Sequence, residues 1–336
     1  MDSGSTIEQA KISMDVDTSW KARLSGMAQK AGLLMVIVLL CAIFGSFNPV
    51  FLSYGNFMEI LRAGSLYFIV ACASTMILVG GGLDFSVGSI FPLGGIVAGA
   101  LMLAGMPWPV AIIFGVLAGA LVGLVNAIVI VKYDVPPLIA TLGTFFAIGG
   151  AITVYTGGTN LFGFPDSFNI LGQGRFFGIP YLVFYAVIFG VIFHILLEHT
   201  VFGYETRIVG GNRQAASANG VRVEWLDMKL YALSGATAAL AGIMFVARTS
   251  TASPAAGGSA LTFQVITAII IGGTSLFGGT GSITGTALGV MMFAVLNNGL
   301  AVINVNPLYQ NIFIGFVLVA AVAFDQMQRK RRFKAR

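Results

Sequence analysis

The chain has 336 residues, of which 57% are hydrophobic and only 9% are charged, and its formal net charge is +5. Soluble domains carry about 25% charged residues, so this composition excludes an ordinary soluble protein and indicates an integral membrane protein. The basic residues lie in loops between apolar segments, and this placement argues against nucleic-acid binding.

Ten apolar segments follow one another along the chain, each about long enough to cross a bilayer. Their approximate ranges are 31–51, 57–79, 85–105, 109–131, 136–156, 179–197, 229–248, 262–279, 283–303 and 307–325. Helices are the usual way to satisfy every backbone polar group of such a segment in lipid. The sequence therefore predicts an all-α, polytopic membrane protein with about ten transmembrane helices.

The distribution of Lys and Arg predicts how these segments are oriented. With a cytoplasmic N-terminus, all but three of the 18 Lys and Arg residues fall on the cytoplasmic side, and the exceptions are Arg62, Arg175 and Arg248. Positively charged loops stay in the cytoplasm, so both chain ends are predicted to be cytoplasmic. The chain then divides into a cytoplasmic arm, a transmembrane domain and a basic cytoplasmic tail, at residues 1–30, 31–325 and 326–336.

The string VGGGLDFSVGS, residues 79–89, interrupts the apolar pattern between the second and third segments. Three consecutive glycines break a helix, and Asp84 is expected to cap the next one, with Ser86 as an alternative cap. Non-helical backbone at membrane depth is tolerated only where it is buried in protein or lines a cavity. We therefore predict a broken or re-entrant helix that either shapes a pathway or lets helices pack closely.

A second glycine-rich string, GGTSLFGGTGSI at 272–283, echoes GGLDFSVGSI at 81–90. Both place a glycine pair, polar residues and Gly-Ser-Ile between two spans, a feature that suits transporters built from internal repeats. The glycines expected to break helices in the two strings are Gly80, Gly81, Gly82, Gly88, Gly272, Gly273, Gly278 and Gly279.

Two loops between the segments are long enough to have a role of their own. The outer loop, 157–178, is rich in Gly, Phe and Asn, and it either covers the outer mouth, docks a partner or only connects two segments. The inner loop, 198–228, contains RQAASAN between Asn212, a good helix N-cap, and Gly220, a good stop residue. We expect a short helix there that either docks in a partner's groove or belongs to a solvated linker.

Polar residues inside or beside the apolar segments are candidates for a translocation pathway. Uncharged hydrogen-bonding side chains next to aromatic rings suit a polar, uncharged solute, whereas the alternative role is hydrogen bonding between helices. The candidate set is Asp84, Ser86, Asn126, Thr144, Phe145, Gln264, Asn297 and Asn298.

The sequence offers little for catalysis. It contains no nucleotide-binding loop of the G-x-x-x-x-G-K-[S/T] type and no cluster of metal ligands. Both histidines, His194 and His199, lie with Glu198 at the inner end of one segment, so no catalytic triad can be assembled. We therefore expect a transport protein without metal, cofactor or catalytic site. An ion-coupled transporter is the weaker alternative, because such proteins bury carboxylates within their spans and acids are scarce there.

Four strings together resemble the monosaccharide-type permeases of ABC importers, the ribose/xylose/arabinose group. They are GGLDFSVGSI, PPLIATLGTFFAIGGAITVYTGG, VGGNRQAASANGVRV and GGTSLFGGTGSITGTALG, and the resemblance covers about residues 30–330. It implies a permease subunit in a bacterial inner membrane that pairs with an identical or a different second permease. It also implies a cytoplasmic ATPase that binds ATP and magnesium, and a binding protein that delivers the sugar from outside.

The resemblance also implies that the inner loop carries a coupling helix, which transmits ATP-driven closure to the spans. The residues at the corresponding positions are Asn212, Arg213, Gln214, Ala215, Ala216, Ser217, Asn219 and Gly220. At two positions the sequence differs from many members of this group. Ser217 follows the double alanine, where an Arg followed by a small residue is common, and Thr262 stands where an acidic residue is common. Within the same machinery the solute could instead be a polyol, a furanose-like signal or a nucleoside. A scaffold protein is a further alternative, although it would not need broken helices.

Overall fold

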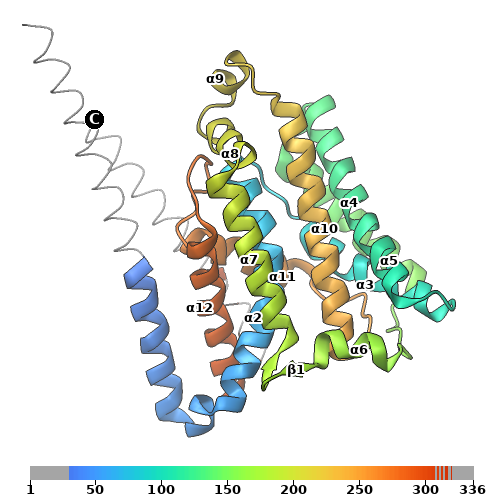
Figure 1. Cartoon of the computed structure of the whole chain (residues 1–336), viewed down its shortest axis with the longest axis vertical. Helices are drawn as coiled ribbons and strands as arrows, with labels where there is room; N and C mark the ends of the chain where they lie inside the picture. The colour runs from blue at the N-terminus through green and yellow to red at the C-terminus, as the bar shows by residue number, and fades with distance from the viewer. Residues whose placement is uncertain (1–29, 307–308, 310–311, 313–314, 317–318, 320–336) are drawn as a thin grey trace, which may run out of the picture.

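Long apolar helices that run roughly side by side make up most of the computed structural model (Figure 1). The residues that it describes are 30–306, 309, 312, 315, 316 and 319. Within them, seven helices are long and apolar enough to cross a membrane: Lys30–Phe47, α2 (Tyr54–Val79), α4 (Trp108–Lys132), α5 (Pro137–Thr156), α7 (Tyr181–His199), α10 (Val223–Thr249) and α12 (Ile283–Val302). The chain is an all-α, polytopic membrane protein, as its composition predicts.

Two further apolar helices are shorter, and each adjoins a glycine-rich string. α3 (Val87–Leu103) has 17 residues and α11 (Gly258–Ile271) has 14. At the helical rise per residue these lengths give about 26 and about 21 Å, less than the hydrocarbon thickness of about 30 Å. The apolar helices of the described residues correspond to the first nine predicted segments. The tenth, 307–325, lies almost wholly outside the described residues, so the number of ten stays a prediction.

Shorter elements lie at the two ends of the bundle (Figure 1). One end holds η1 (Pro49–Leu52), α6 (Asp166–Gln173) and an antiparallel pair of two-residue strands, β1 (Arg175–Phe176) and β2 (Ile179–Pro180). The other end holds α8 (Val201–Gly211) and α9 (Arg213–Ala218). The predicted outer loop thus contains a helix and a strand of its own, and the inner loop contains a helix, α8, that its sequence did not predict.

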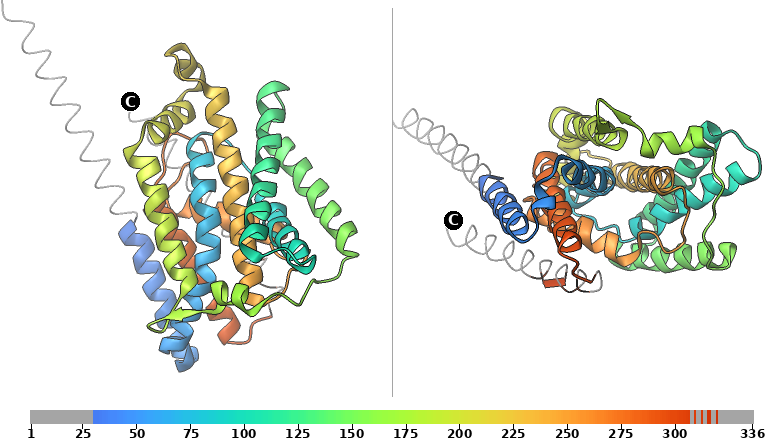
Figure 2. Two further views of the ribbon diagram at one scale, coloured as in Figure 1. Left: turned by 45° about the vertical axis from the view of Figure 1, so that its right-hand side comes forward. Right: turned by 90° about the horizontal axis from the view of Figure 1, so that it is seen from below.

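α2 and α10 form the centre of the bundle, as the view along the helices shows (Figure 2, right). In each, 72% of an 18-residue window is buried inside the protein, compared with 17% in α5 and 11% in Lys30–Phe47. α10 packs on α4, α3 and α2. The outer helices therefore present most of their apolar surface to lipid or to other chains, whereas α2 and α10 contact other helices nearly all round.

Glycines allow the close contact between α4 and α10. A Cβ atom on Gly235 of α10 would lie 2.0 Å from the carbonyl oxygen of Gly119, and one on Gly123 would lie 2.0 Å from that of Tyr231. Gly115 completes a row of glycines every four residues along α4. Small residues at this spacing bring helix backbones together in membranes, where van der Waals packing replaces the hydrophobic effect between helices.

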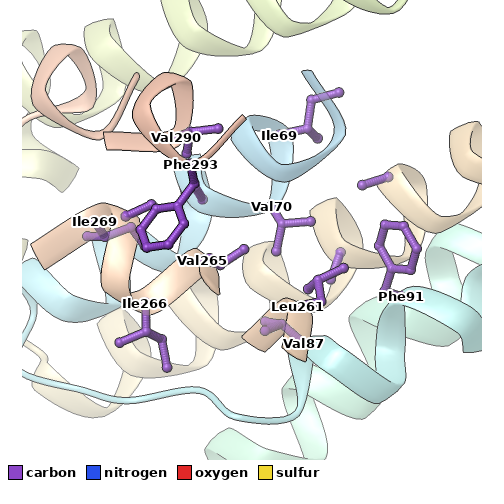
Figure 3. Close-up of a cluster of buried hydrophobic side chains, with 14 of the residues drawn as sticks. Ile69, Val70, Val87, Phe91, Leu261, Val265, Ile266, Ile269, Val290 and Phe293 are labelled. Atoms are coloured by element: carbon purple, nitrogen blue, oxygen red, sulfur yellow. The ribbon is translucent and has the colours of Figure 1, made fainter. Parts of the chain in front are cut away.

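The two short helices share one buried apolar cluster with α2 and α12 (Figure 3). The side chains labelled there come from α2, α3, α11 and α12 and are Ile69, Val70, Val87, Phe91, Leu261, Val265, Ile266, Ile269, Val290 and Phe293. This cluster holds α3 and α11 in place, although neither is long enough to be a full span. Their glycine-rich ends are thereby fixed inside the bundle.

Candidate functional site

α2 ends in a turn that needs glycine. Gly80 caps the helix, Gly81 has a φ of +81°, and the Gly82 N–H donates to the carbonyl oxygen of Ile77 at 2.9 Å. This is a Schellman motif, in which the residue after the cap takes the left-handed conformation that glycine adopts at no steric cost. α2 therefore ends at these three glycines.

α11 ends in the same way. Gly272 caps it, Gly273 has a φ of +93°, and the Thr274 N–H donates to the carbonyl oxygen of Ile269 at 3.2 Å. Gly278 and Gly279, in the following loop, also have positive φ values. The matching turns make Gly80 equivalent to Gly272, one residue earlier than the sequence echo aligned them.

The prediction that Gly88 breaks a helix is wrong. Gly88 lies within the first turn of α3 and continues that helix. Its lack of a side chain matters for packing instead, since a Cβ atom there would lie 2.3 Å from the carbonyl oxygen of Gly258 and from Oγ1 of Thr262.

The two glycine-rich strings meet each other and α8. The Gly279 N–H donates to the carbonyl oxygen of Val79 at 2.8 Å, so the second string bonds to the end of α2. Gly210 of α8 packs into the same place, because a Cβ atom there would lie 1.8 Å from the Val79 oxygen and 2.6 Å from the Gly279 nitrogen. The broken end of α2 is thus enclosed by backbone from two other parts of the chain.

Asp84 follows this turn and is 3% exposed. Its Oδ1 accepts hydrogen bonds from the backbone N–H of Ser86 at 3.0 Å and from the Ser86 hydroxyl, and its Oδ2 accepts one from the Ser234 hydroxyl at 2.8 Å. Within the described part of the chain no Lys or Arg pairs with it. A buried carboxylate is tolerated only with such hydrogen bonds, so its donors are fixed around it.

The expected helix cap at Asp84 takes a different form. α3 begins at Val87, and Ser86 occupies the cap position with helical φ and ψ of −68° and −16° and no capping side-chain bond. Its hydroxyl donates to Asp84 instead, and Asp84 accepts from the residue before the helix rather than from the helix itself. Asp84 therefore holds the entry to α3 without capping it.

Four of the eight candidate pathway residues join in one network. From Asp84 it continues through Ser86, whose hydroxyl accepts from Nδ2 of Asn126 at 2.8 Å, to Thr144, whose hydroxyl donates to Oδ1 of Asn126. Asn126 lies on α4 and Thr144 on α5, so the network connects both helices to the broken element. Ser234 of α10, which the sequence analysis missed, completes it. The sequence offered little reason to select Ser234, because it is one small polar residue in an apolar span.

The other four candidates lie elsewhere. Asn298 of α12 and Asn56 of α2 exchange amide hydrogen bonds at 2.9 Å in both directions. Gln264 is buried on α11, Asn297 lies on α12, and Phe145 makes an edge contact with its neighbour Phe146. Hydrogen bonding between helices, the alternative role of these polar residues, is thus present at the network and at Asn298.

The short helix in the inner loop has the predicted ends. The side chain of Asn212 accepts from the Ala215 N–H at 2.9 Å, and Gly220 has a φ of +85°. Ala216 is fully buried, whereas the rest of the predicted coupling segment is exposed at the end of the bundle (Figure 1). Arg213, the first residue of α9, forms an ion pair with Asp227 of α10.

The opposite end carries a cluster of charges. The carboxylate of Glu59 lies 3.3 Å from Arg62, 3.2 Å from Arg175 and 3.5 Å from Arg248. These are the three basic residues that the sequence analysis placed outside. Arg62 also donates to the carbonyl oxygen of Gly172 at the end of α6. Arg62 lies three residues after Glu59 in α2, and two arginines from other elements share the carboxylate.

Comparison with known proteins gives one family match and close relatives. The family described as "Branched-chain amino acid transport system / permease component" matches residues 56–322. The ribose import permease protein RbsC of Bacillus subtilis is 36% identical over 308 residues, which cover 91% of this chain and 95% of the relative.

Two other relatives are named for different sugars. The D-allose transport system permease protein AlsC of Escherichia coli K12 is 33% identical over 303 residues, 90% of this chain and 93% of its own length. The L-arabinose ABC transporter permease protein AraH of Azospirillum brasilense is 33% identical over 306 residues, 91% and 90% of the two chains. No solved structure matches the chain.

Proposed function

Because the chain belongs to the family of branched-chain amino acid transport system permease components, we propose that it is the membrane-spanning subunit of an ATP-driven importer for a monosaccharide. One observation carries the choice of solute: relatives named for ribose, allose and arabinose transport each match about nine-tenths of this chain. As in other ABC permeases, the chain moves the solute and does not itself hydrolyse ATP. ATP and magnesium bind to the partner ATPase.

The end of the bundle that carries α8 and α9 is the cytoplasmic one in this proposal. Three basic residues of the inner loop, Arg207, Arg213 and Arg222, and Lys229 directly after it support this orientation. Both chain ends are then cytoplasmic, with residues 1–30 as an arm and 326–336 as a tail, and the membrane is the bacterial inner membrane. Residues 1–29 and 326–336 lie outside the described residues.

The ATPase binds at α9, the coupling helix within the loop 198–228. The exposed side chains of Gln214, Ala215 and Ser217 form its contact surface. Ala216 is buried and packs α9 against the rest of the chain. A second permease chain, identical or not, and an extracytoplasmic sugar-binding protein complete the importer. The binding protein approaches the opposite end, where α6 and the strands lie.

The solute passes beside the network that begins at Asp84. Its polar atoms come from four segments, and Thr144 lies on α5, of which only a small part is buried in this chain. The partly exposed Thr144 offers a neutral hydroxyl, which suits a sugar, and the buried Ser86 and Asn126 hold it in place through the network. Gln264, Asn297 and Asn298 line the same route from the side of α11 and α12.

The first experiment is purification of the tagged chain from its native membrane in mild detergent. We expect an ATPase to copurify with the wild type and to be lost from Ala215→Glu, which inserts a charge into the exposed face of α9. Ala255→Glu is the matched control, because Ala255 is an exposed alanine in the loop between α10 and α11. Ala216 is not used, since a charge at this buried position would disturb folding.

Retention of the ATPase by Ala215→Glu would contradict the docking site, and a wild type without any ATPase would contradict the function. Uptake by vesicles supplied with the binding protein then identifies the solute. Ribose, allose, arabinose and galactose are tested beside a polyol and a nucleoside. If only the polyol or only the nucleoside is taken up with ATP, the chain is still an ABC importer permease, but its solute is not a monosaccharide.

A further inference from the structure

One face of α10 touches both α9 and the broken end of α2. Asp227, Tyr231 and Ser234 are spaced four and three residues apart, which places them in one row along the helix. All three are buried, with 6%, 2% and 0% of their surface exposed. Each of them bonds to a different position outside α10.

The row begins at α9 and ends at the Asp84 network. Asp227 pairs with Arg213, the first residue of α9. One turn further, the Tyr231 hydroxyl donates to the carbonyl oxygen of Leu83 at 3.1 Å. Ser234 then donates to Oδ2 of Asp84 at 2.8 Å. The same rigid helix is therefore bonded to α9 at one point and to two consecutive residues of the broken element at two others.

α8, on the other side of α9, touches the same element through backbone. Gly210, near its end, leaves no room for a side chain against Val79 and Gly279. Only Asn212 separates α8 from α9. A displacement of α9 is thus transmitted to residues 79–84 from both sides: by van der Waals contact through α8, and by hydrogen bonds through α10.

We propose that Tyr231 and Ser234 are positioning residues that make segment 80–86 move together with α9. The inference rests on the proposed function, in which the ATPase displaces α9. The stiffness of α10 carries the displacement, and the two hydrogen bonds transfer it to the broken element that holds the buried carboxylate of Asp84. Neither residue contacts the ATPase or is required for ATP hydrolysis.

The test uses the assembled importer in vesicles, with Tyr231→Phe and Ser234→Ala combined in one variant. These changes remove two hydroxyl groups and leave the shape of the buried surface nearly intact. We expect ATP hydrolysis within about twofold of the wild type, whereas the solute moved per ATP falls about fivefold, within the range found for residues that carry coupling.

A second readout follows the segment itself. Hydrogen exchange is measured in the peptides that cover 80–86 and 213–218, with and without nucleotide. In the wild type nucleotide changes exchange in both peptides. In the double variant the change at 213–218 remains and that at 80–86 disappears. A purely structural role for the hydroxyls would raise exchange at 80–86 in both states without removing its response to nucleotide.

Two matched changes serve as controls. Tyr204→Phe removes the hydroxyl of an exposed tyrosine on α8, and Ser65→Ala removes one whose hydrogen bond stays within α2. Both should keep the wild-type ratio of solute to ATP. If the double variant does not assemble, Tyr231→Phe alone is used, and it should lower the ratio as well.

The possible failures are distinguishable. If the assembled double variant keeps the wild-type ratio of solute to ATP, the inference is wrong and the proposed function still holds. The same conclusion follows if nucleotide still changes hydrogen exchange at 80–86 in that variant. A wild type that moves no solute with ATP overturns both.

Discussion

Asp84 and Glu59 are two carboxylates that the chain stabilises in opposite ways. Asp84 is 3% exposed and accepts three hydrogen bonds from neutral donors. Glu59 has a side chain that is 38% exposed and lies beside three arginines. Burial makes Asp84 depend on each of its donors, whereas water screens the charges around Glu59.

The difference shows which part of the molecule tolerates change. The donors to Asp84 come from its own segment and from α10, so a movement of one of these parts relative to the other breaks a buried bond. The arginines around Glu59 sit on long side chains from α2, the β1 strand and α10, which adjust individually. We expect the effects of substitution to decrease from the interior network to the charged end.

Asp84→Ala should have the largest effect. It leaves the hydroxyls of Ser86 and Ser234 and one backbone N–H without their buried acceptor, at a cost of about 3 kcal/mol or more. We expect a lower yield of folded protein and a lower melting temperature in detergent, measured by intrinsic fluorescence.

Asp84→Asn is the control for this prediction. The amide keeps an acceptor oxygen for Ser86 and offers its NH₂ group to the oxygen of Ser234, so most of the loss should be recovered. Equal destabilisation by the two variants would show that the charge, and not the hydrogen bonding, is needed there.

Gly210→Ala should come second. Its Cβ atom would overlap the carbonyl oxygen of Val79, which is backbone and cannot rotate away, so α8 must separate from α2. Overpacking of this kind costs about 1–3 kcal/mol. The melting temperature checks it, with Gly211→Ala as the matched control, because nothing lies within 4 Å of a Cβ atom on Gly211. Equal melting temperatures of the two variants would contradict the tight packing of α8.

Asn126→Ala should have an intermediate effect. It removes the amide that links Ser86 to Thr144, and each buried group that loses its partner costs about 1–3 kcal/mol, less where a hydroxyl can turn to another acceptor. Thr144 has such an acceptor, the carbonyl oxygen of Ala140 at 3.0 Å in its own helix. Even so, Thr144→Val removes only one of the two side-chain hydrogen bonds of Asn126, whereas Asn126→Ala removes both, so Thr144→Val should melt closer to the wild type. A lower melting temperature for Thr144→Val than for Asn126→Ala would mean that Thr144 on α5 contributes more to stability than Asn126.

The sequence predicted the local features of this arrangement well. Apolar length located the first nine helices, and glycine chemistry located the turns at Gly81 and Gly273 and the end of α9 at Gly220. These features depend on the conformations of a few neighbouring residues. α8 was missed because its sequence, VFGYETRIVGG, contains three glycines and no apolar run of span length.

Long-range contacts could not be read in the same way. Half of the polar set gathers at Asp84 because α4, α5 and α10 pack around the start of α3, and no local pattern gives that packing. Arg62 is three residues from Glu59 in the same helix, but Ser234 and Arg248 lie 150 and 189 residues from the carboxylates they contact. Only the packed helices bring them together.

Glu59→Gln should have the smallest effect on stability. Each exposed ion pair contributes about 0.2–1 kcal/mol at most, and the neutral amide keeps an acceptor for the nearest arginine. The three arginines lose their shared counter-charge, so their mutual repulsion should lower the melting temperature slightly at low salt and not at high salt. Arg175→Gln is the control, because it removes one positive charge from the most exposed of the three and leaves Glu59 paired. A loss as large as that of Asp84→Ala, or one independent of salt, would mean that the cluster at this end is as rigidly held as the interior network.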